Sequence, residues 1–165
     1  MSKSSLRLEK VTEDNVLEAC RLQVAPEQRK FVSPVAQSLA EAYVHGDTAW
    51  PRVVMDGDEL VGFVMAFFDV PFTEGCHHDR PRSGLWRLNI AADRQGRGYG
   101  RFAVEAVCEE IRRRGGTTAT VTWVQAEGGP EEFYRKLGFH LTGETSEDEV
   151  VGERDLGSPA QAPVL

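Results

Sequence analysis

Residues 93–103 read DRQGRGYGRFA, in which three glycines alternate with arginine and tyrosine. An apolar run, LWRLNIAA, comes directly before this stretch, and a helix-like run, RFAVEAVCEEIRRR, begins within it. The pattern predicts a strand, a glycine-rich loop and a long helix in succession. The loop leaves backbone N–H groups exposed at the helix start, where the helix dipole adds about half a positive charge. Together with its arginines, the loop therefore predicts a site for a phosphate or pyrophosphate. The glycines are Gly96, Gly98 and Gly100, and the nearby arginines are Arg94, Arg97 and Arg101.

Two common nucleotide-binding loops fit this stretch less well. A P-loop requires a Gly-Lys pair, and the chain contains none. A dinucleotide-binding fold could use Gly98-x-Gly100-x-x-Ala103, but it expects a ribose-binding acid about 20 residues later. The segment TTATVTWV (117–124) offers no such acid. A glycine-rich turn without a ligand remains as the structural alternative.

The elements around the loop predict one mixed sheet with helices on its faces. The hairpin expected at 51–70 turns at Asp56-Gly57-Asp58. The second helix is expected to begin near Ser33-Pro34 and to bury a stripe of Val35, Leu39 and Tyr43. The expected elements are a strand at 6–11, a helix capped by Thr12 or Asp14, the second helix, the hairpin, a strand at 84–91, a helix to Arg114, a strand at 118–124, a short helix ending at Gly138, and strands at 139–144 and 149–156.

The loop and a second motif resemble one known family. QGRGYG (95–100) matches the Q/R-x-x-G-x-G/A pyrophosphate loop of the GCN5-related N-acetyltransferases (GNATs), and EEFYRKLGF (131–139) is similar to the tyrosine-bearing helix of that family. The order of elements matches as well. Within the family, VAPEQRKFVSP, LWRLNIAADRQGRGYG and GGPEEFYRKLGF look most like the polyamine acetyltransferase branch. Glu127 stands where many relatives have an asparagine, so any cofactor contact of that asparagine is in doubt.

The resemblance implies an α/β (α+β) fold, a mixed and mostly antiparallel sheet with helices on both faces and a splayed central strand pair. We expect one domain at 1–155 and a disordered tail at 156–165. The implied activity is acetyl transfer from the co-substrate acetyl-CoA to a primary amine, by direct attack in a ternary complex. No metal is implied.

The resemblance also implies the roles of individual residues. Backbone groups of Leu88, Asn89 and Ile90 would pair with the pantetheine arm where the strand splays from its neighbour near Val124. Tyr134 would act as general acid on the departing thiolate, although an aromatic core residue is the alternative. The pyrophosphate would be held by Gln95, Gly96, Arg97, Gly98, Tyr99, Gly100 and Arg101.

Charge favours a small cationic acceptor. The net charge is −7, from 19 Lys and Arg against 26 Asp and Glu. A primary amine with a pKa near 10.4 is only about 0.1% neutral at pH 7.4, so the site must remove a proton. Glu27 is our first candidate for binding the amine, and Trp86 for lining the acceptor pocket; other acids are Glu41, Asp47 and Glu74. An amine antibiotic, an amino acid, a protein amine, or a non-catalytic acyl-CoA-binding module remain alternatives.

The composition indicates a soluble, cytoplasmic protein. The chain of 165 residues is 41% hydrophobic and 27% charged, which is typical of one globular domain. Its acidity argues against nucleic acid as a partner, and no signal peptide or membrane segment is expected. Three widely spaced cysteines indicate a reducing compartment. CHHD (76–79) contains residue types that bind zinc, but a solvated loop fits this segment better. A homodimer is left open.

Overall fold

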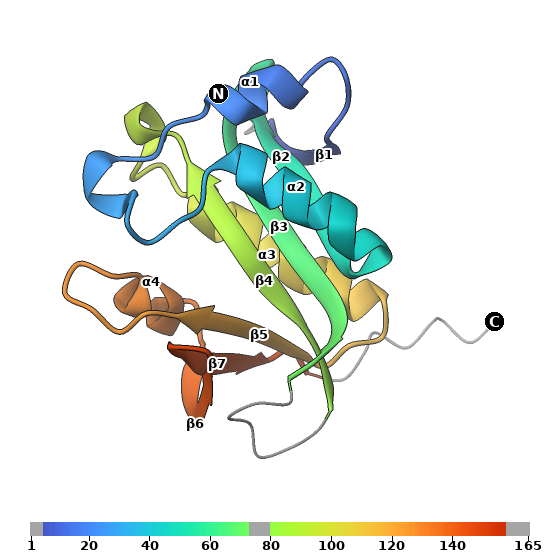
Figure 1. Cartoon of the computed structure of the whole chain (residues 1–165), viewed down its shortest axis with the longest axis vertical. Helices are drawn as coiled ribbons and strands as arrows, with labels where there is room; N and C mark the ends of the chain where they lie inside the picture. The colour runs from blue at the N-terminus through green and yellow to red at the C-terminus, as the bar shows by residue number, and fades with distance from the viewer. Residues whose placement is uncertain (1–4, 73–79, 158–165) are drawn as a thin grey trace.

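The computed structural model describes residues 5–72 and 80–157, and within them seven strands form one sheet (Figure 1). The order of helices and strands along the chain is the one predicted from the sequence. The strands are β1 (Leu6–Lys10), β2 (Ala49–Asp56), β3 (Glu59–Pro71), β4 (Pro81–Ile90), β5 (Thr118–Trp123), β6 (His140–Ser146) and β7 (Glu149–Asp155), and the helices are α1 (Val16–Arg21), α2 (Val35–His45), α3 (Tyr99–Arg113) and α4 (Glu131–Lys136).

The sheet has the spatial order β1-β2-β3-β4-β5-β7-β6. Neighbouring strands are antiparallel except for β4 and β5, which are parallel. The β2–β3 hairpin turns at Gly57, whose φ of 61° is the left-handed conformation that Asp-Gly favours. Residues 61–68 of β3 are all buried because helices cover both faces of the sheet.

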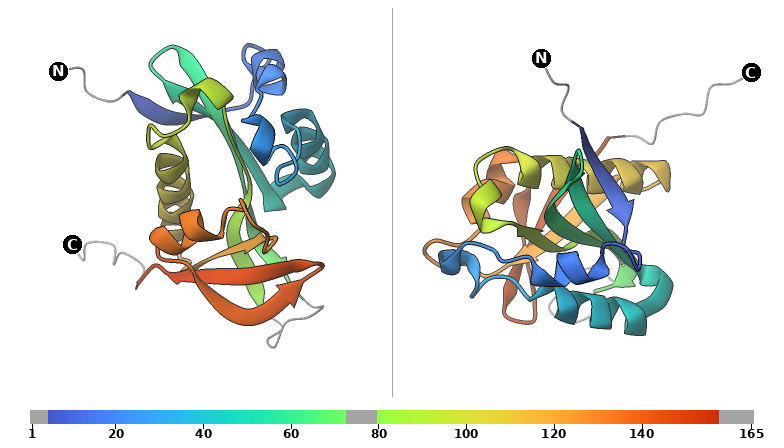
Figure 2. Two further views of the ribbon diagram at one scale, coloured as in Figure 1. Left: turned by 90° about the vertical axis from the view of Figure 1, so that its left-hand side faces the viewer. Right: turned by 90° about the horizontal axis from the view of Figure 1, so that it is seen from above.

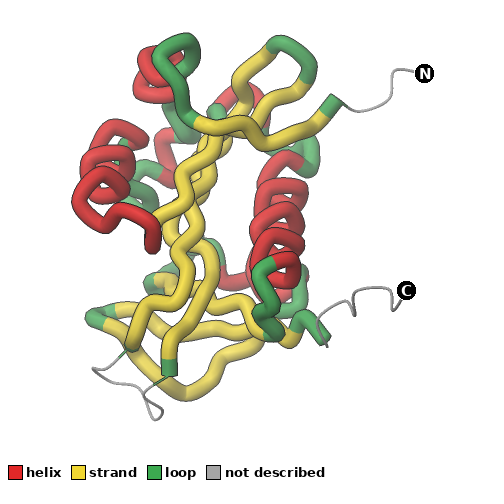
Figure 3. Tube along the Cα trace, turned by 90° about the vertical axis from the view of Figure 1, so that its right-hand side faces the viewer, coloured by secondary structure: helices red, strands yellow, loops and turns green. Residues whose placement is uncertain are grey.

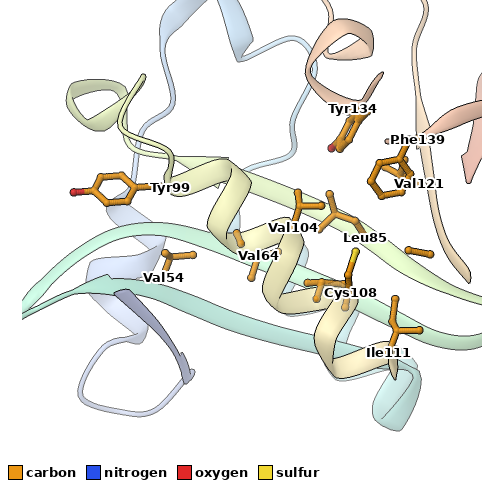
Figure 4. Close-up of a cluster of buried hydrophobic side chains, with 14 of the residues drawn as sticks. Val54, Val64, Leu85, Tyr99, Val104, Cys108, Ile111, Val121, Tyr134 and Phe139 are labelled. Carbon is orange, nitrogen blue, oxygen red and sulfur yellow. The ribbon is translucent and has the colours of Figure 1, made fainter. Parts of the chain in front are cut away.

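The helices lie on opposite faces of the sheet (Figures 2 and 3). Ala19 of α1 and Val35 of α2 pack against Phe63 and Met65 of β3 on one face. Val64 points to the other face, because side chains alternate along a strand, and there it joins the larger cluster under α3 (Figure 4). The buried residues of α3 are Tyr99, Ala103, Val104, Val107, Cys108 and Ile111.

The sheet splits between its two parallel strands. The pairing of β4 with β5 is confined to Gly84 with Thr120 and Leu85 with Val121, after which the strands diverge (Figure 1). A Cβ on Gly84 would overlap the carbonyl oxygen of Thr120, so only glycine allows the two backbones to approach so closely here. This close approach of the two backbones fixes where the gap between the strands begins, and it confirms the predicted splayed pair.

A buried ion pair links the two halves of the sheet near Gly84. Arg82 of β4 lies 2.6 Å from a carboxylate oxygen of Glu144 and 3.3 Å from one of Glu153, which lie on β6 and β7. Because Arg82 and Glu144 are almost completely buried, removal of either charge should destabilise the fold.

Two local predictions about the first helices are wrong. Tyr43 is 90% exposed, so the predicted stripe of α2 holds only at Val35, which is buried, and at Leu39, which is partly buried against the same cluster. A four-residue repeat advances about 40° per step around a helix, so the predicted stripe rotates away from the sheet. The first helix begins at Val16, because Asn15 holds residues 12–15 in a turn: its Oδ1 accepts a hydrogen bond from the N–H of Thr12 at 2.9 Å.

The C-terminal boundary also differs from the prediction. Leu156, the last residue of the strand expected at 149–156 and the first of the tail expected at 156–165, is only 6% exposed and belongs to the core. Its N–H donates to the carbonyl of Thr117 at 2.8 Å, and its own carbonyl accepts a bond from Arg112 Nε at 3.1 Å. The domain therefore extends past 155, and residues 158–165 of the predicted tail lie outside the described residues.

Candidate active site

A cleft of about 1100 Å³ opens where β4 and β5 diverge. Leu88 and Ile90 of β4 line its floor, together with Thr122 and Trp123 of β5. Its walls come from the glycine loop, α2, α4 and the turn between β6 and β7, which are far apart in the sequence. The cleft thus joins the predicted pyrophosphate loop and the predicted catalytic helix in one cavity.

The glycine loop ends at the first turn of α3. Gly96 and Gly98 have φ values of 75° and 81°, a conformation that other residues adopt only with strain. Gly98 is the N-cap of the 15-residue helix and has no side chain with which to cap it. The first helical bond runs from the N–H of Phe102 to the carbonyl of Gly98 at 3.0 Å. The N–H groups of residues 99–101 therefore lack an intrahelical acceptor and, with the dipole, form an anion site.

The first turn of α3 packs closely on α4. A Cβ on Gly100 would lie 3.2 Å from Cζ of Phe133 and 3.8 Å from Cδ2 of Leu88. Glycine at this position lets the helix start lie against the catalytic helix candidate. The loop and α4 therefore form one continuous wall.

The arginines near the loop differ in availability. Arg94 is paired with Glu59, with 2.7 Å between Nη2 and Oε2. Arg97 and Arg101 are exposed and form no ion pair with another residue of the described chain. Arg101 lines the cleft, whereas the guanidinium of Arg97 hydrogen-bonds to the hydroxyl of Tyr99, so Arg101 is the better placed of the two for an anion in the cleft.

Three predicted cofactor residues turn their side chains elsewhere. The hydroxyl of Tyr99 donates to Oδ2 of Asp56 at 2.6 Å, and this bond raises the pKa of Tyr99. Gln95 Nε2 donates to the carbonyl of Ile90 at 2.8 Å, and buried Asn89 donates from Nδ2 to the carbonyl of Ser33 at 2.9 Å. Any role of Tyr99 or Asn89 at the cleft would fall to the backbone, while their side chains hold the loop and the segment before α2 in place.

Tyr134 is buried among aromatic rings and also lines the cleft. Its ring stacks on Trp123 with centroids 5.4 Å apart and contacts Phe133 and Phe139 edge-on. Figure 4 shows its hydroxyl oxygen pointing away from Phe139. Burial and the nearby charge of Glu149 raise the pKa of Tyr134, so the phenol keeps its proton at neutral pH.

The opposite wall of the cleft carries most of its carboxylates. Glu41 of α2, Glu147 of the β6–β7 turn and Glu149 of β7 line it, and Arg87 of β4 lies among them. Arg87 Nη2 is 3.0 Å from Oε2 of Glu41. Trp86 also lines the cleft, in edge contact with His45 at 5.3 Å between centroids. A shift in register opposite Met65 and Ala66 makes Trp86 an extra residue in β4.

Glu149 is the acidic residue that sequence reasoning missed. Burial raises the pKa of its carboxyl and Glu147 adds to the rise, while Arg87 and a hydrogen bond with Thr122 act in the opposite direction. Nothing in EVVGERD distinguishes a strand-starting glutamate from an ordinary surface charge. By contrast, Glu27 is exposed and lies outside the cleft lining, where its neighbour Gln28 takes part.

The structure also bears on metal and membrane sites. Within residues 5–72 and 80–157, no three His, Cys, Asp or Glu side chains are grouped to hold a metal ion. Glu74 and the CHHD segment at 76–79 lie outside the described residues. None of the described helices is both long and apolar enough to cross a membrane.

The fold and the cleft define an acyl-CoA-dependent transferase, and sequence comparison shows its family. A model of the acetyltransferase (GNAT) family matches residues 12–139. The chain therefore belongs to this family and is an acetyltransferase that uses acetyl-CoA. No curated protein sequence matches the chain.

Solved structures share the fold at low sequence identity. The ribosomal-protein-S18-alanine N-acetyltransferase from Escherichia coli is 15% identical, with a TM-score of 0.64 over 97% of this chain and 99% of that one. An acetyltransferase from Thermus thermophilus is 21% identical, with a TM-score of 0.66 over 92% and 97%. The PaiA N-acetyltransferase from Thermoplasma acidophilum, solved with coenzyme A, is 13% identical, with a TM-score of 0.62 over 92% and 99%.

Proposed function

We propose that this acetyltransferase transfers the acetyl group to a primary amine of a small cationic molecule, with a polyamine as the first candidate. The observation that carries the proposal is the wall of Glu41, Glu147 and Glu149 in the same cleft as Tyr134. Three carboxylates against the single guanidinium of Arg87 make this side net negative. Such a wall attracts an ammonium group and repels an anionic acceptor.

The pairing of Arg87 argues against an acceptor that carries a carboxylate. Its guanidinium is already engaged by Glu41 at 3.0 Å, so an amino acid would have to displace that carboxylate. A polycation meets no such competition. This difference makes an amino acid the weaker candidate.

The wall formed by the glycine loop and the start of α3 fits the pyrophosphate of acetyl-CoA. The N–H groups at the start of α3 and the charges of Arg97 and Arg101 would hold it, with Gln95, Gly96, Gly98, Tyr99 and Gly100 contributing backbone. Beyond Leu85 the edge of β4 facing β5 is unpaired, so backbone groups of Leu88, Asn89 and Ile90 could pair with the pantetheine arm as an added strand. The Gln95 bond to the Ile90 carbonyl limits how far that pairing extends.

Tyr134 would supply the proton that the departing sulfur requires. A thiol has a pKa near 8.5, so a phenol whose pKa is raised is a weaker acid than the thiol and gives its proton only as the C–S bond breaks. Its fixed position between Trp123 and Phe133 holds the hydroxyl ready for that transfer. Both described cysteines, Cys20 and Cys108, are free thiols, consistent with the cytoplasmic location that we propose.

The test is an acceptor panel in which CoA thiol release is measured with acetyl-CoA. Spermidine, spermine and simple diamines should support turnover, and glutamate and a peptide with a free N-terminus should support much less. Turnover with the peptide and none with the polyamines would refute the small-cation acceptor.

A further inference from the structure

The acidic wall holds three carboxylates, and their surroundings differ. Glu41 accepts hydrogen bonds from Arg87 at 3.0 Å and from Gln37 at 3.1 Å, so its oxygens are already engaged. Glu147 is exposed in the β6–β7 turn, where its φ is 53°. Glu149 is half-buried at the start of β7 and faces the cleft beside Thr122. Glu149 thus combines partial burial with no ion pair among the described residues, whereas Glu41 is paired with Arg87 and Glu147 is exposed.

We propose that Glu149 is the residue that takes the proton from the acceptor ammonium group, and that Arg87, held by Glu41, tunes its strength as a base. This assignment rests on the proposed function. Glu149 and Tyr134 line one cavity, and the charge of Glu149 acts on Tyr134. The acceptor nitrogen and the departing sulfur must both lie near these two groups.

The proton balance is complete with these two residues. The first proton of the ammonium group goes to the Glu149 carboxylate and then to water, which frees the nitrogen lone pair. The amine nitrogen attacks the thioester carbonyl carbon, the C–N bond forms and the C–S bond breaks. Tyr134 gives its proton to the sulfur, and the second proton of the nitrogen then restores the Tyr134 hydroxyl. One ammonium group and one thioester yield one amide, one thiol and one released proton.

The charges around Glu149 explain why it suits this role. Burial raises the pKa of its carboxyl, which makes it a stronger base than an exposed glutamate. Arg87 from β4 opposes the rise, Glu147 from the turn adds to it, and Thr122 of β5 stabilises the charged form by a hydrogen bond. Tyr134 of α4 is uncharged, and Glu41 of α2 partly neutralises Arg87.

Apart from the three carboxylates, His45 also lines the cleft and could act as a base. It is exposed at the end of α2 and contacts Trp86 edge-on. In that position solvent competes for its nitrogens. His45→Gln is therefore included in the test as the rival assignment.

The experiment compares Glu149→Gln with Asp148→Asn, a matched loss of one charge from the same hairpin but at an exposed residue outside the cleft lining. With spermidine and acetyl-CoA near pH 7, Glu149→Gln should lower kcat/KM by about 10²-fold, while Asp148→Asn should change it by less than about fivefold. Acetyl-CoA affinity, measured by calorimetry, should be unchanged in both variants, which separates the proton role from folding.

The pH profile gives a readout that a structural role would not move. Below the pKa of Glu149 the wild-type rate should fall, and Glu149→Gln should instead rise steadily with pH as the amine deprotonates in solution. Arg87→Gln should move the acidic limb to higher pH, because removal of the positive charge raises the pKa of Glu149 further.

The outcomes separate the inference from the proposed function. An active wild type whose Glu149→Gln variant matches Asp148→Asn in rate and profile would overturn the inference alone. So would a His45→Gln variant that loses the acidic limb while Glu149→Gln keeps it. A wild type that releases no CoA with any amine overturns both.

Discussion

The two walls of the cleft are built from different parts of the polypeptide. The wall around α3 presents backbone N–H groups from one continuous segment, with Gly96 and Gly98 in left-handed conformations. The facing wall presents the side chains of Glu41, Glu147 and Glu149, which come from segments about a hundred residues apart. A backbone site depends on local conformation, whereas a side-chain site depends on how distant segments pack. The first wall should therefore respond to backbone strain and the second to single charges.

The largest effect is expected where β4 and β5 pair, at Gly84 and Thr120, because the gap that holds the cleft begins there. Gly84→Ala places a methyl group against the Thr120 carbonyl and should destabilise the fold by about 3 kcal/mol. Urea unfolding measures the loss, and acetyl-CoA binding and amine turnover should fall together. Gly143→Ala is the control, because its Cβ meets nothing within 4 Å and only its φ of 87° is unfavourable. Equal losses of unfolding free energy in the two variants would show that the approach of β4 to β5 at residue 84 does not require glycine.

The next effect concerns the group between the two walls. Tyr134→Phe keeps the stacked ring and removes only the hydroxyl, so kcat should fall at least about tenfold while acetyl-CoA affinity is unchanged. Because burial raises the pKa of Tyr134, the wild type should keep its acid form above pH 10, the ordinary pKa of tyrosine. An acid with a raised pKa is lost only at higher pH. A variant that turns over amine at the wild-type rate would rule out the assignment.

A smaller effect should be specific to the backbone wall. Gly98→Asp adds strain and a negative charge at the N-cap of α3 and should weaken acetyl-CoA binding by at least about tenfold. Gly115→Asp is the matched control, since its φ of 89° imposes similar strain at the opposite end of the helix. If calorimetry shows the same affinity for both variants, the pyrophosphate lies elsewhere.

The smallest effects should distinguish residues inside and outside the acidic wall. Glu41→Gln frees the charge of Arg87 and should raise KM for spermidine by about fivefold, equivalent to about 1 kcal/mol. Glu27→Gln should leave KM within about twofold, because Glu27 is exposed and outside the cleft lining. Steady-state kinetics on both variants decides between them. The reverse order of effects would restore Glu27 as the amine-binding residue.

The sequence by itself determined the family, the order of elements and the loop. Glycines at 96 and 98 mark left-handed backbone, and a helix start beside them follows from the apolar periodicity of 102–111. These features are local, so a short stretch contains all the information they require. The tyrosine helix at 131–136 could be predicted for the same reason.

Only the tertiary structure decided which side chains face the cleft. It turns Tyr99 toward Asp56 and Asn89 toward Ser33, exposes Glu27 and brings Glu149 beside Thr122 and Tyr134. It also shows that Gly84, an ordinary strand glycine in the sequence, lies where the backbones of β4 and β5 approach closely. These outcomes depend on register, on the bulge in β4 and on contacts between residues far apart in the chain, such as Asn89 and Ser33, which are 56 positions apart. None of these leaves a periodic signal in the sequence.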